Sequence, residues 1–319
     1  MNDFNVLGTD LFGDPIKPRN QGPVADRFII PPFTILDAKQ GDWQERKRSW
    51  IAMGIAGEIG RDAESYSCNG ENGEKYDYMP KFDTGTSIFD PVVCELAYRW
   101  FCPKGGQVID PFAGGSVRGA VAKALHRKYW GCDLRPDQVE ANIRQAEEIF
   151  NDYDGESLDM FGDQDLYWAA GDSVDMLDNA PDADFIFTCP PYGDLEKYSD
   201  DPNDLSNMDH HAFIAKYKRI ILKAVKKLNE DRFACVVVGD FRDSKGFYRN
   251  FVSDTISAFE LCGMKLYNEA ILATSVGSAC MRVTKQFNSG RKLAKTHQNI
   301  LVFVKGNPKK AAEACIGDD

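Results

Sequence analysis

Residues 107–133 read QVIDPFAGGSVRGAVAKALHRKYWGCD, and this stretch decides the fold class. A short apolar run leads through a glycine-containing turn into a segment whose apolar residues have helical spacing, and a second apolar run follows. Strand, helix and strand in this order form the unit from which parallel sheets are built. The stretch therefore predicts an α/β domain with a mostly parallel sheet.

The same alternation continues towards the C-terminus. Further strands are expected at 166–173, 184–191 and 232–241, and helices at 136–150, 210–229 and 247–263. The last two apolar runs, 265–274 and 299–306, have no helical pattern between them, so we expect a terminal antiparallel pair. The sequence thus predicts a Rossmann-like, mostly parallel sheet of seven strands with helices on both faces.

Length and composition fit one large domain with additions at both ends. With 319 residues, of which 43% are hydrophobic, the chain can bury a full core. We expect an N-terminal extension over residues 1–80, the main domain over 81–307 and a C-terminal tail over 308–319. No run of about eighteen apolar residues occurs, so no membrane association is expected. Nothing in the sequence indicates the oligomeric state.

The cysteines indicate neither a zinc site nor a disulfide framework. The nine cysteines are scattered along the chain, odd in number and without any C-x-x-C pair. Reduced thiols are typical of the cytoplasm, where we expect the protein to be located. No metal is expected.

Charge is distributed unevenly along the chain. The formal net charge of -11 counts against a nucleic-acid partner, because phosphate binding depends on clustered lysine and arginine. The segment between Ala270 and Ala312 nevertheless contains no Asp or Glu and many basic residues. Such a run is more often a solvated surface than a DNA contact, although it is compatible with both.

Three strand ends carry candidate cofactor contacts. The loop DPFAGGS at 110–116 follows an apolar strand and begins a helix, where glycine lets the backbone approach a ligand and the amides hold a negative group. The next two strands end in Asp133 and Asp172, which places carboxylates where a ribose would offer hydroxyls. A nicotinamide-binding loop would have G-x-G-x-x-G, which this loop lacks.

The segment TCPPYG at 188–193 ends the fourth predicted strand and is the most specific signal in the chain. Two prolines stiffen the backbone and remove two amide donors, so that the carbonyl oxygens act as acceptors. Tyr192 offers a flat ring face. A base whose exocyclic amine acts as a nucleophile needs such acceptors and a stacking surface. A purely structural rigid turn is the less favoured interpretation.

Together, the two segments resemble the D-P-F-x-G-x-G and Pro-Pro-aromatic motifs of the N4-cytosine and N6-adenine DNA methyltransferases. The resemblance covers roughly residues 82–306, with Ser116 where the family usually has glycine. It implies a Rossmann-like methyltransferase fold, S-adenosyl-L-methionine as the cofactor and double-stranded DNA as the partner. PPFTILDAKQGDWQERKR and CPPYGDLEKYSDDP more specifically resemble the methyltransferases of phages and prophages.

The resemblance also implies roles for individual residues. The implied catalytic residues are Cys189, Pro190, Pro191 and Tyr192. The implied cofactor-binding residues are Asp110, Phe112, Ala113, Gly114, Asp133 and Asp172, to which a segment before the first strand adds Thr86, Ser87 and Phe89. An ordinary helix N-cap accounts equally well for the hydroxyls of that segment.

Cys189 occupies the position where the family has Ser, Asp or Asn. In the family, serine at this position tends to accompany methylation of cytosine N4, and Asp or Asn that of adenine N6. Because cysteine is closer to serine in shape, cytosine N4 is the favoured target and adenine N6 the alternative. A cysteine nucleophile that adds to a pyrimidine ring is a second interpretation, which Thr188 before it and Pro-Pro-Tyr after it disfavour. An RNA base methyltransferase and a catalytically silent binding protein are the remaining alternatives.

Basic residues between the last two strands are the expected DNA contacts. They are Arg282, Lys285, Arg291, Lys292 and Lys295. The stretch from Trp43 to Trp50 is also basic and aromatic, but we expect it to form an amphipathic helix packed on the main domain. Asp240 and Arg242, after the fifth main strand, are expected to shape the base pocket or to pair with each other.

Overall fold

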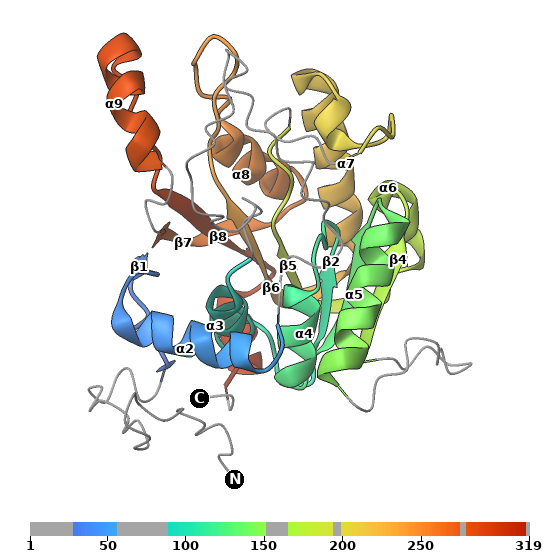
Figure 1. Ribbon diagram of the computed structural model, residues 1–319. Coiled ribbons are helices and arrows are strands. Elements are labelled where there is room, and N and C mark those ends of the chain that lie inside the picture. Colours follow the sequence, from blue (N-terminus) through green and yellow to red (C-terminus); the bar gives the residue numbers. More distant parts are fainter. Residues whose placement is uncertain (1–27, 56–88, 151–164, 194–198, 275–278, 317–319) are drawn as a thin grey trace.

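The computed structural model describes residues 28–55, 89–150, 165–193, 199–274 and 279–316 (Figure 1). These residues form one eight-stranded sheet in the order β1-β7-β8-β6-β5-β2-β3-β4. The strands are β1 (Ile35–Asp37), β2 (Gln107–Asp110), β3 (Lys128–Asp133), β4 (Leu166–Ala170), β5 (Ala183–Thr188), β6 (Leu228–Val238), β7 (Lys265–Ala273) and β8 (His297–Lys305). Only β8 runs antiparallel to its described neighbours, β6 and β7.

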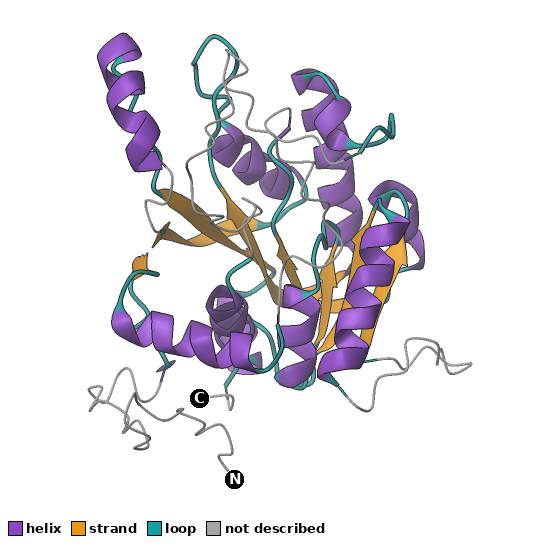
Figure 2. Ribbon diagram, viewed as in Figure 1, coloured by secondary structure: helices purple, strands orange, loops and turns teal. Residues whose placement is uncertain are grey.

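Helices cover both faces of this sheet (Figure 2). They are α2 (Gly41–Ala52), α3 (Pro91–Phe101), α4 (Val117–Ala124), α5 (Pro136–Ile149), α6 (Ser173–Met176), α7 (His210–Lys227), α8 (Phe251–Leu261), α9 (Ala279–Gly290) and α10 (Pro308–Ala314). Alternate residues of β5 point to opposite faces: Phe185 and Phe187 join the core beneath α3 and α4, whereas Ile186 joins the core beneath α7 and α8.

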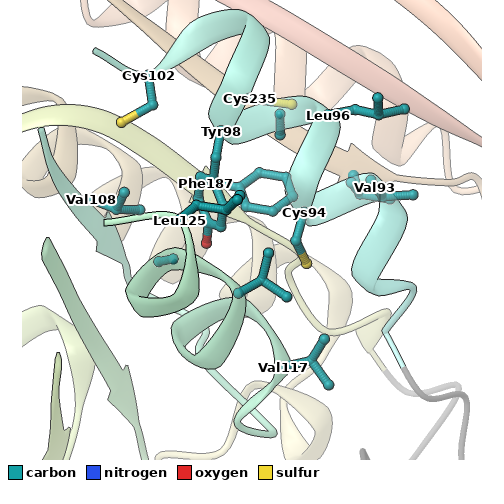
Figure 3. Packing of buried hydrophobic residues seen from close by; sticks show 14 of the residues in the cluster. Val93, Cys94, Leu96, Tyr98, Cys102, Val108, Val117, Leu125, Phe187 and Cys235 are labelled. Atoms are coloured by element: carbon teal, nitrogen blue, oxygen red, sulfur yellow. The ribbon is translucent and has the colours of Figure 1, made fainter. Parts of the chain in front are cut away.

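The first of these cores is centred on aromatic rings (Figure 3). The Tyr98 ring of α3 meets Phe187 edge-on, with ring centroids 5.3 Å apart. α3 begins at Pro91, and Asp90 caps it by accepting from the Val92 amide. The helix is buried along most of its length because apolar residues occupy most of its positions. Burial of this helix holds the segment directly before β2 in place.

The predicted fold class is confirmed: the sheet is mostly parallel, helices lie on both faces, and β7 and β8 form the terminal antiparallel pair. The sheet has one strand more than expected, because residues 35–37 pair in parallel with β7. The expectation of no helix between the last two strands was wrong, since α9 occupies residues 279–290. Its basic and polar composition masked a helical spacing that Val283 and Phe287 share.

The strand order shows where a ligand would be expected to bind on this sheet. From β2 the chain proceeds outward through β3 to β4, and from β5 it proceeds through β6 in the opposite direction. The carboxyl ends of β2 and β5 therefore flank the topological switch point, where open α/β sheets bind ligands. No helix in the described part of the chain is long and apolar enough to cross a membrane.

Candidate active site

A cavity of about 390 Å³ opens at this switch point. Its walls come from the loop after β2, from the ends of β3 and β4, from the segment after β5 and from the N-terminal region. Of the residues predicted as site residues, it is lined by Phe89, Phe112, Gly114, Asp133, Asp172, Cys189, Pro190, Pro191 and Tyr192. The volume lies within the range of cofactor and small-molecule pockets.

Asp110 organises this region from below and does not line the cavity. Its carboxylate is fully buried and accepts hydrogen bonds from Arg118 Nε at 2.5 Å, Tyr129 Oη at 2.8 Å and Thr188 Oγ1 at 2.6 Å. Burial, with a further contribution from Asp110, raises the pKa of Tyr129, so this hydroxyl stays protonated and donates. Asp110 is thus a positioning residue.

Arg118 shapes the glycine loop through its carbonyls. Its Nη2 donates to the oxygens of Phe112 at 2.6 Å and Ala113 at 2.8 Å. Asn142 of α5 donates to the Gly114 oxygen at 2.7 Å, and Gly114 adopts a φ of 50°. Because these carbonyls point towards protein donors, the loop has one defined shape. Ala113 is completely buried beneath it and does not line the cavity.

Ser116 has a local explanation for its departure from glycine. Its hydroxyl donates to Oε1 of the buried Gln145 on α5. Gln138 and Asn142 continue the same helix face, joined by a 2.9 Å hydrogen bond. A row of amide side chains therefore supports the loop from behind, and the serine satisfies one of them.

The two predicted acids lie at the cavity wall as expected, already engaged with backbone. Asp133 accepts from the amides of Gly114 at 3.0 Å and Arg135 at 2.9 Å. Asp172 caps α6 through the Val174 amide at 2.9 Å and pairs with Lys216 of α7 at 2.7 Å. Both carboxylates are therefore held in place at the wall, and a carboxylate can accept several hydrogen bonds at once.

The segment after β5 forms the other end of the cavity. Cys189, Pro190, Pro191 and Tyr192 all line it. The Tyr192 ring is held edge-on by Phe241 and Phe251, with centroids 6.1 and 6.4 Å away. Its hydroxyl accepts a 2.8 Å hydrogen bond from Gln298 Nε2 at the start of β8. The two phenylalanine rings and the hydrogen bond to its hydroxyl therefore hold the Tyr192 ring in place.

Lys295 lies close to this tyrosine. A Cβ at Gly239 would be 3.4 Å from Lys295 Cε and 3.8 Å from Tyr192 Oη, so both side chains lie next to this glycine. Burial lowers the pKa of Lys295, and the nearby Asp240 opposes this shift. Asp240 accepts from the Val252 amide at 3.1 Å, and Arg242 packs over the Tyr248 ring.

The N-terminal region supplies a wall that sequence reasoning missed. Ala38, Gln44 and Lys47 line the cavity beside Phe89, and Lys47 pairs with Asp90 at 3.2 Å. Trp43, which is buried, also donates to Asp90. The expected packing of this helix on the main domain is therefore observed. Its approach to the site is also observed, although the sequence did not predict it. The contacts join residues some 45 positions apart, and no local pattern signals them.

The expected DNA contacts lie on and after α9, which projects from the sheet edge in Figure 1. Lys285 and Arg291 are exposed, and Arg291 packs over the Phe287 ring. Lys292 reaches Gly246 in the loop after β6. The side chain of Arg282 and the residues Thr86 and Ser87 lie outside the described residues. Within the described part of the chain, no cluster of His, Cys, Asp or Glu is suited to a metal ion.

No protein-family model matches the sequence, and no curated protein matches it. Among solved structures, the chain is similar to TrmN from Thermus thermophilus (12% identity, TM-score 0.43, covering 68% of this chain and 49% of that one, about half its length). It is also similar to the precorrin-6y C5,15-methyltransferase from Geobacter metallireducens GS-15 (12% identity, TM-score 0.42, covering 69% of this chain and 89% of that one). A third similarity is to a candidate DNA modification methylase, also from Thermus thermophilus (18% identity, TM-score 0.31, covering 42% of this chain and 50% of that one).

Proposed function

We propose that the protein is an S-adenosyl-L-methionine-dependent methyltransferase that acts on an exocyclic amine of a DNA base, with cytosine N4 favoured. One observation carries the proposal: the glycine loop and the Pro190-Pro191-Tyr192 segment line the same cavity, at the switch point of the sheet. Two motifs separated by some seventy residues thus form the two halves of one site.

The volume and the lining of the cavity support the choice of cofactor. Asp133 would accept from the ribose hydroxyls and Asp172 from the adenine amine, while Phe112, Leu134 and Ile220 provide apolar walls for the purine. The glycine loop would hold the methionyl part near Phe89. When bound, the cofactor supplies an electrophilic methyl group on a positively charged sulfur.

The chain's own residues orient the nucleophile. The carbonyl oxygens of Cys189 and Pro190 would accept the N–H groups of the base amine, turning its lone pair towards the cofactor. The Tyr192 ring would stack on the base that has left the duplex. Methyl transfer would leave a positive charge on the base amine, which is neutralised when one N–H proton passes to solvent water. Fixed acceptors at this point favour the positively charged amine that precedes proton loss.

The direct test is incubation with the methyl donor and unmethylated duplex DNA, followed by nucleoside mass spectrometry. We expect N4-methylcytosine. N6-methyladenine would change the assigned base, whereas methylation confined to RNA would reject the DNA assignment. If cofactor addition neither shifts the thermal unfolding temperature nor yields a methylated product, a silent binding protein is the correct interpretation.

The variant Cys189→Ser separates amine methylation from covalent catalysis. Serine retains an acceptor of similar shape, so we expect product formation to survive the change. Complete loss of activity with unchanged cofactor binding, together with 5-methylcytosine from the wild type, would support a cysteine nucleophile.

A further inference from the structure

Residues 241–250, here called the Phe247 hairpin, form a tight loop after β6. The loop is closed by hydrogen bonds from the Asp243 amide to the Phe247 oxygen at 2.9 Å and from the Phe247 amide to Asp243 Oδ1 at 2.8 Å. Gly246, with a φ of 92°, makes the turn. The Phe247 side chain is 70% exposed at the tip. A rigid backbone thus presents a large apolar ring to solvent, which needs an explanation.

The hairpin is anchored on the catalytic tyrosine. Phe241 is the first residue of the hairpin, and Phe251 comes directly after its last residue. The rings of both form T-shaped pairs with the Tyr192 ring. The Arg249 amide donates to the Phe241 oxygen at 2.9 Å and closes the stem. At about 3.3 Å per extended residue, the two-residue step from Arg249 to Phe247 places the Phe247 backbone at most roughly 7 Å beyond the stem. The loop rises from the same sheet edge as α9 (Figure 1).

The surroundings of the tip are basic. Lys292 lies against Gly246, and Arg242 packs over Tyr248 with its guanidinium carbon 3.9 Å from the ring centroid. Lys245 is part of the turn itself. Among the described residues, the carboxylates of the hairpin and of the segment before it accept from backbone amides: Asp243 from Phe247, and Asp240 from Val252. An exposed apolar ring surrounded by cations is complementary to stacked bases flanked by phosphates.

We propose that Phe247 inserts into the base stack of duplex DNA and fills the gap that the target nucleotide leaves when it enters the cavity. This inference rests on the proposed function and adds the element that extracts the base. Apolar side chains inserted between base steps compensate part of the unstacking cost. Because the stem touches Tyr192, the wedge and the surface that receives the base belong to one packed unit.

The test compares methyl transfer to native and to heat-denatured unmethylated plasmid DNA. The variants are Phe247→Ala, Phe247→Trp, which keeps a large ring, and Phe33→Ala, which removes a phenylalanine of matching exposure (69%) near β1. We expect Phe247→Ala to lose about tenfold or more on native DNA and less than about twofold on denatured DNA, where no stack must be opened. Phe247→Trp and Phe33→Ala should stay near wild type on both.

Two other results would overturn the inference. One is wild-type activity of Phe247→Ala on native DNA, and the other is an equal loss on both forms, which would indicate a general binding or folding role. Thermal unfolding of each variant shows whether the fold is intact. If the wild type methylates neither form of DNA, or methylates only RNA, the proposed function fails, and this inference fails with it.

Discussion

Thr188 Oγ1 donates a 2.6 Å hydrogen bond to Asp110 Oδ1, and this bond joins the two halves of the site. Asp110 ends β2 and begins the glycine loop, while Thr188 ends β5 and precedes Cys189. Because Arg118 and Tyr129 donate to the other oxygen of the same carboxylate, the position of the proposed methyl donor and that of the acceptor base depend on one buried group.

Asp110→Ala should destabilise the fold strongly. It leaves the buried Arg118 guanidinium without its carboxylate, for which a loss of about 3–5 kcal/mol in unfolding free energy is expected. Urea unfolding measures it. Asp178→Ala, which breaks the ion pair of the exposed Asp178 with Lys223, is the control, with a much smaller expected loss. Similar losses in the two variants would contradict the role given to Asp110.

Tyr192→Ala should reduce turnover far more than Tyr192→Phe. Alanine removes the ring face on which the base stacks, worth about 1–3 kcal/mol, or roughly ten- to hundredfold in rate. Phenylalanine keeps the ring and removes the hydroxyl that accepts from Gln298, for which we expect a loss below about tenfold. Steady-state kinetics on duplex DNA give both values, and cofactor affinity should be unchanged. Equal effects of the two variants would argue against stacking.

Asp133→Ala should weaken cofactor binding by about ten- to a hundredfold, because a charge-assisted hydrogen bond contributes roughly 1.5–3 kcal/mol. Isothermal titration calorimetry with the cofactor measures this affinity. Asp137→Ala is the matched control: this exposed acid lies four positions away and pairs with Arg135. An affinity close to wild type for Asp133→Ala would exclude the assignment to the ribose.

Replacing Arg291, Lys292 and Lys295 together with glutamine should flatten the salt dependence of DNA binding. Each lost phosphate contact reduces the slope of log affinity against log salt by about 0.9. The control changes Lys309 and Lys310 on α10, close to the C-terminus and at the opposite end of the molecule from α9 in Figure 1. If the slope of the triple variant equals that of wild type, these residues do not contact phosphate.

The imidazole of His297 should make stability sensitive to mild acid. Burial, together with the charge of Lys295, lowers the pKa of His297 below its ordinary 6.5 in the folded state. As pH falls through 6.5, the unfolded chain takes up the proton more readily, so the unfolding free energy decreases until the pH passes below the folded-state pKa. Urea unfolding across this window should show a weaker pH dependence for His297→Gln. Identical slopes would assign the sensitivity to other groups.

Local patterns were sufficient for most of the fold. The strand–helix alternation predicted the sheet because the apolar runs had β-type composition and the segments between them had apolar residues at helical spacing. β1 escaped prediction because three residues carry no periodic signal and the strand exists through its pairing with β7. α9 escaped prediction because most of its side chains face solvent, so burial imposes little pattern on it.

The site followed a similar division. Residues at strand ends, such as Asp133 and Tyr192, were predictable because topology alone brings strand ends to one edge. Gln298 and Lys47 were not, because their place at the cavity depends on how β8 and α2 are packed. Asp110 and Ala113 belong to the loop that lines the cavity, but their side chains are buried in the core, and the motif does not specify the direction of a side chain.

The hydrogen bond between Ser116 and Gln145 has a consequence for inheritance. The Ser116 hydroxyl donates to the buried Gln145 Oε1, so changing either side chain alone removes a buried hydrogen bond. Replacement of Ser116 by glycine should be tolerated better when position 145 changes as well. In diverged descendants of this chain, the two positions are therefore expected to covary, and that correlation can be read from sequences alone.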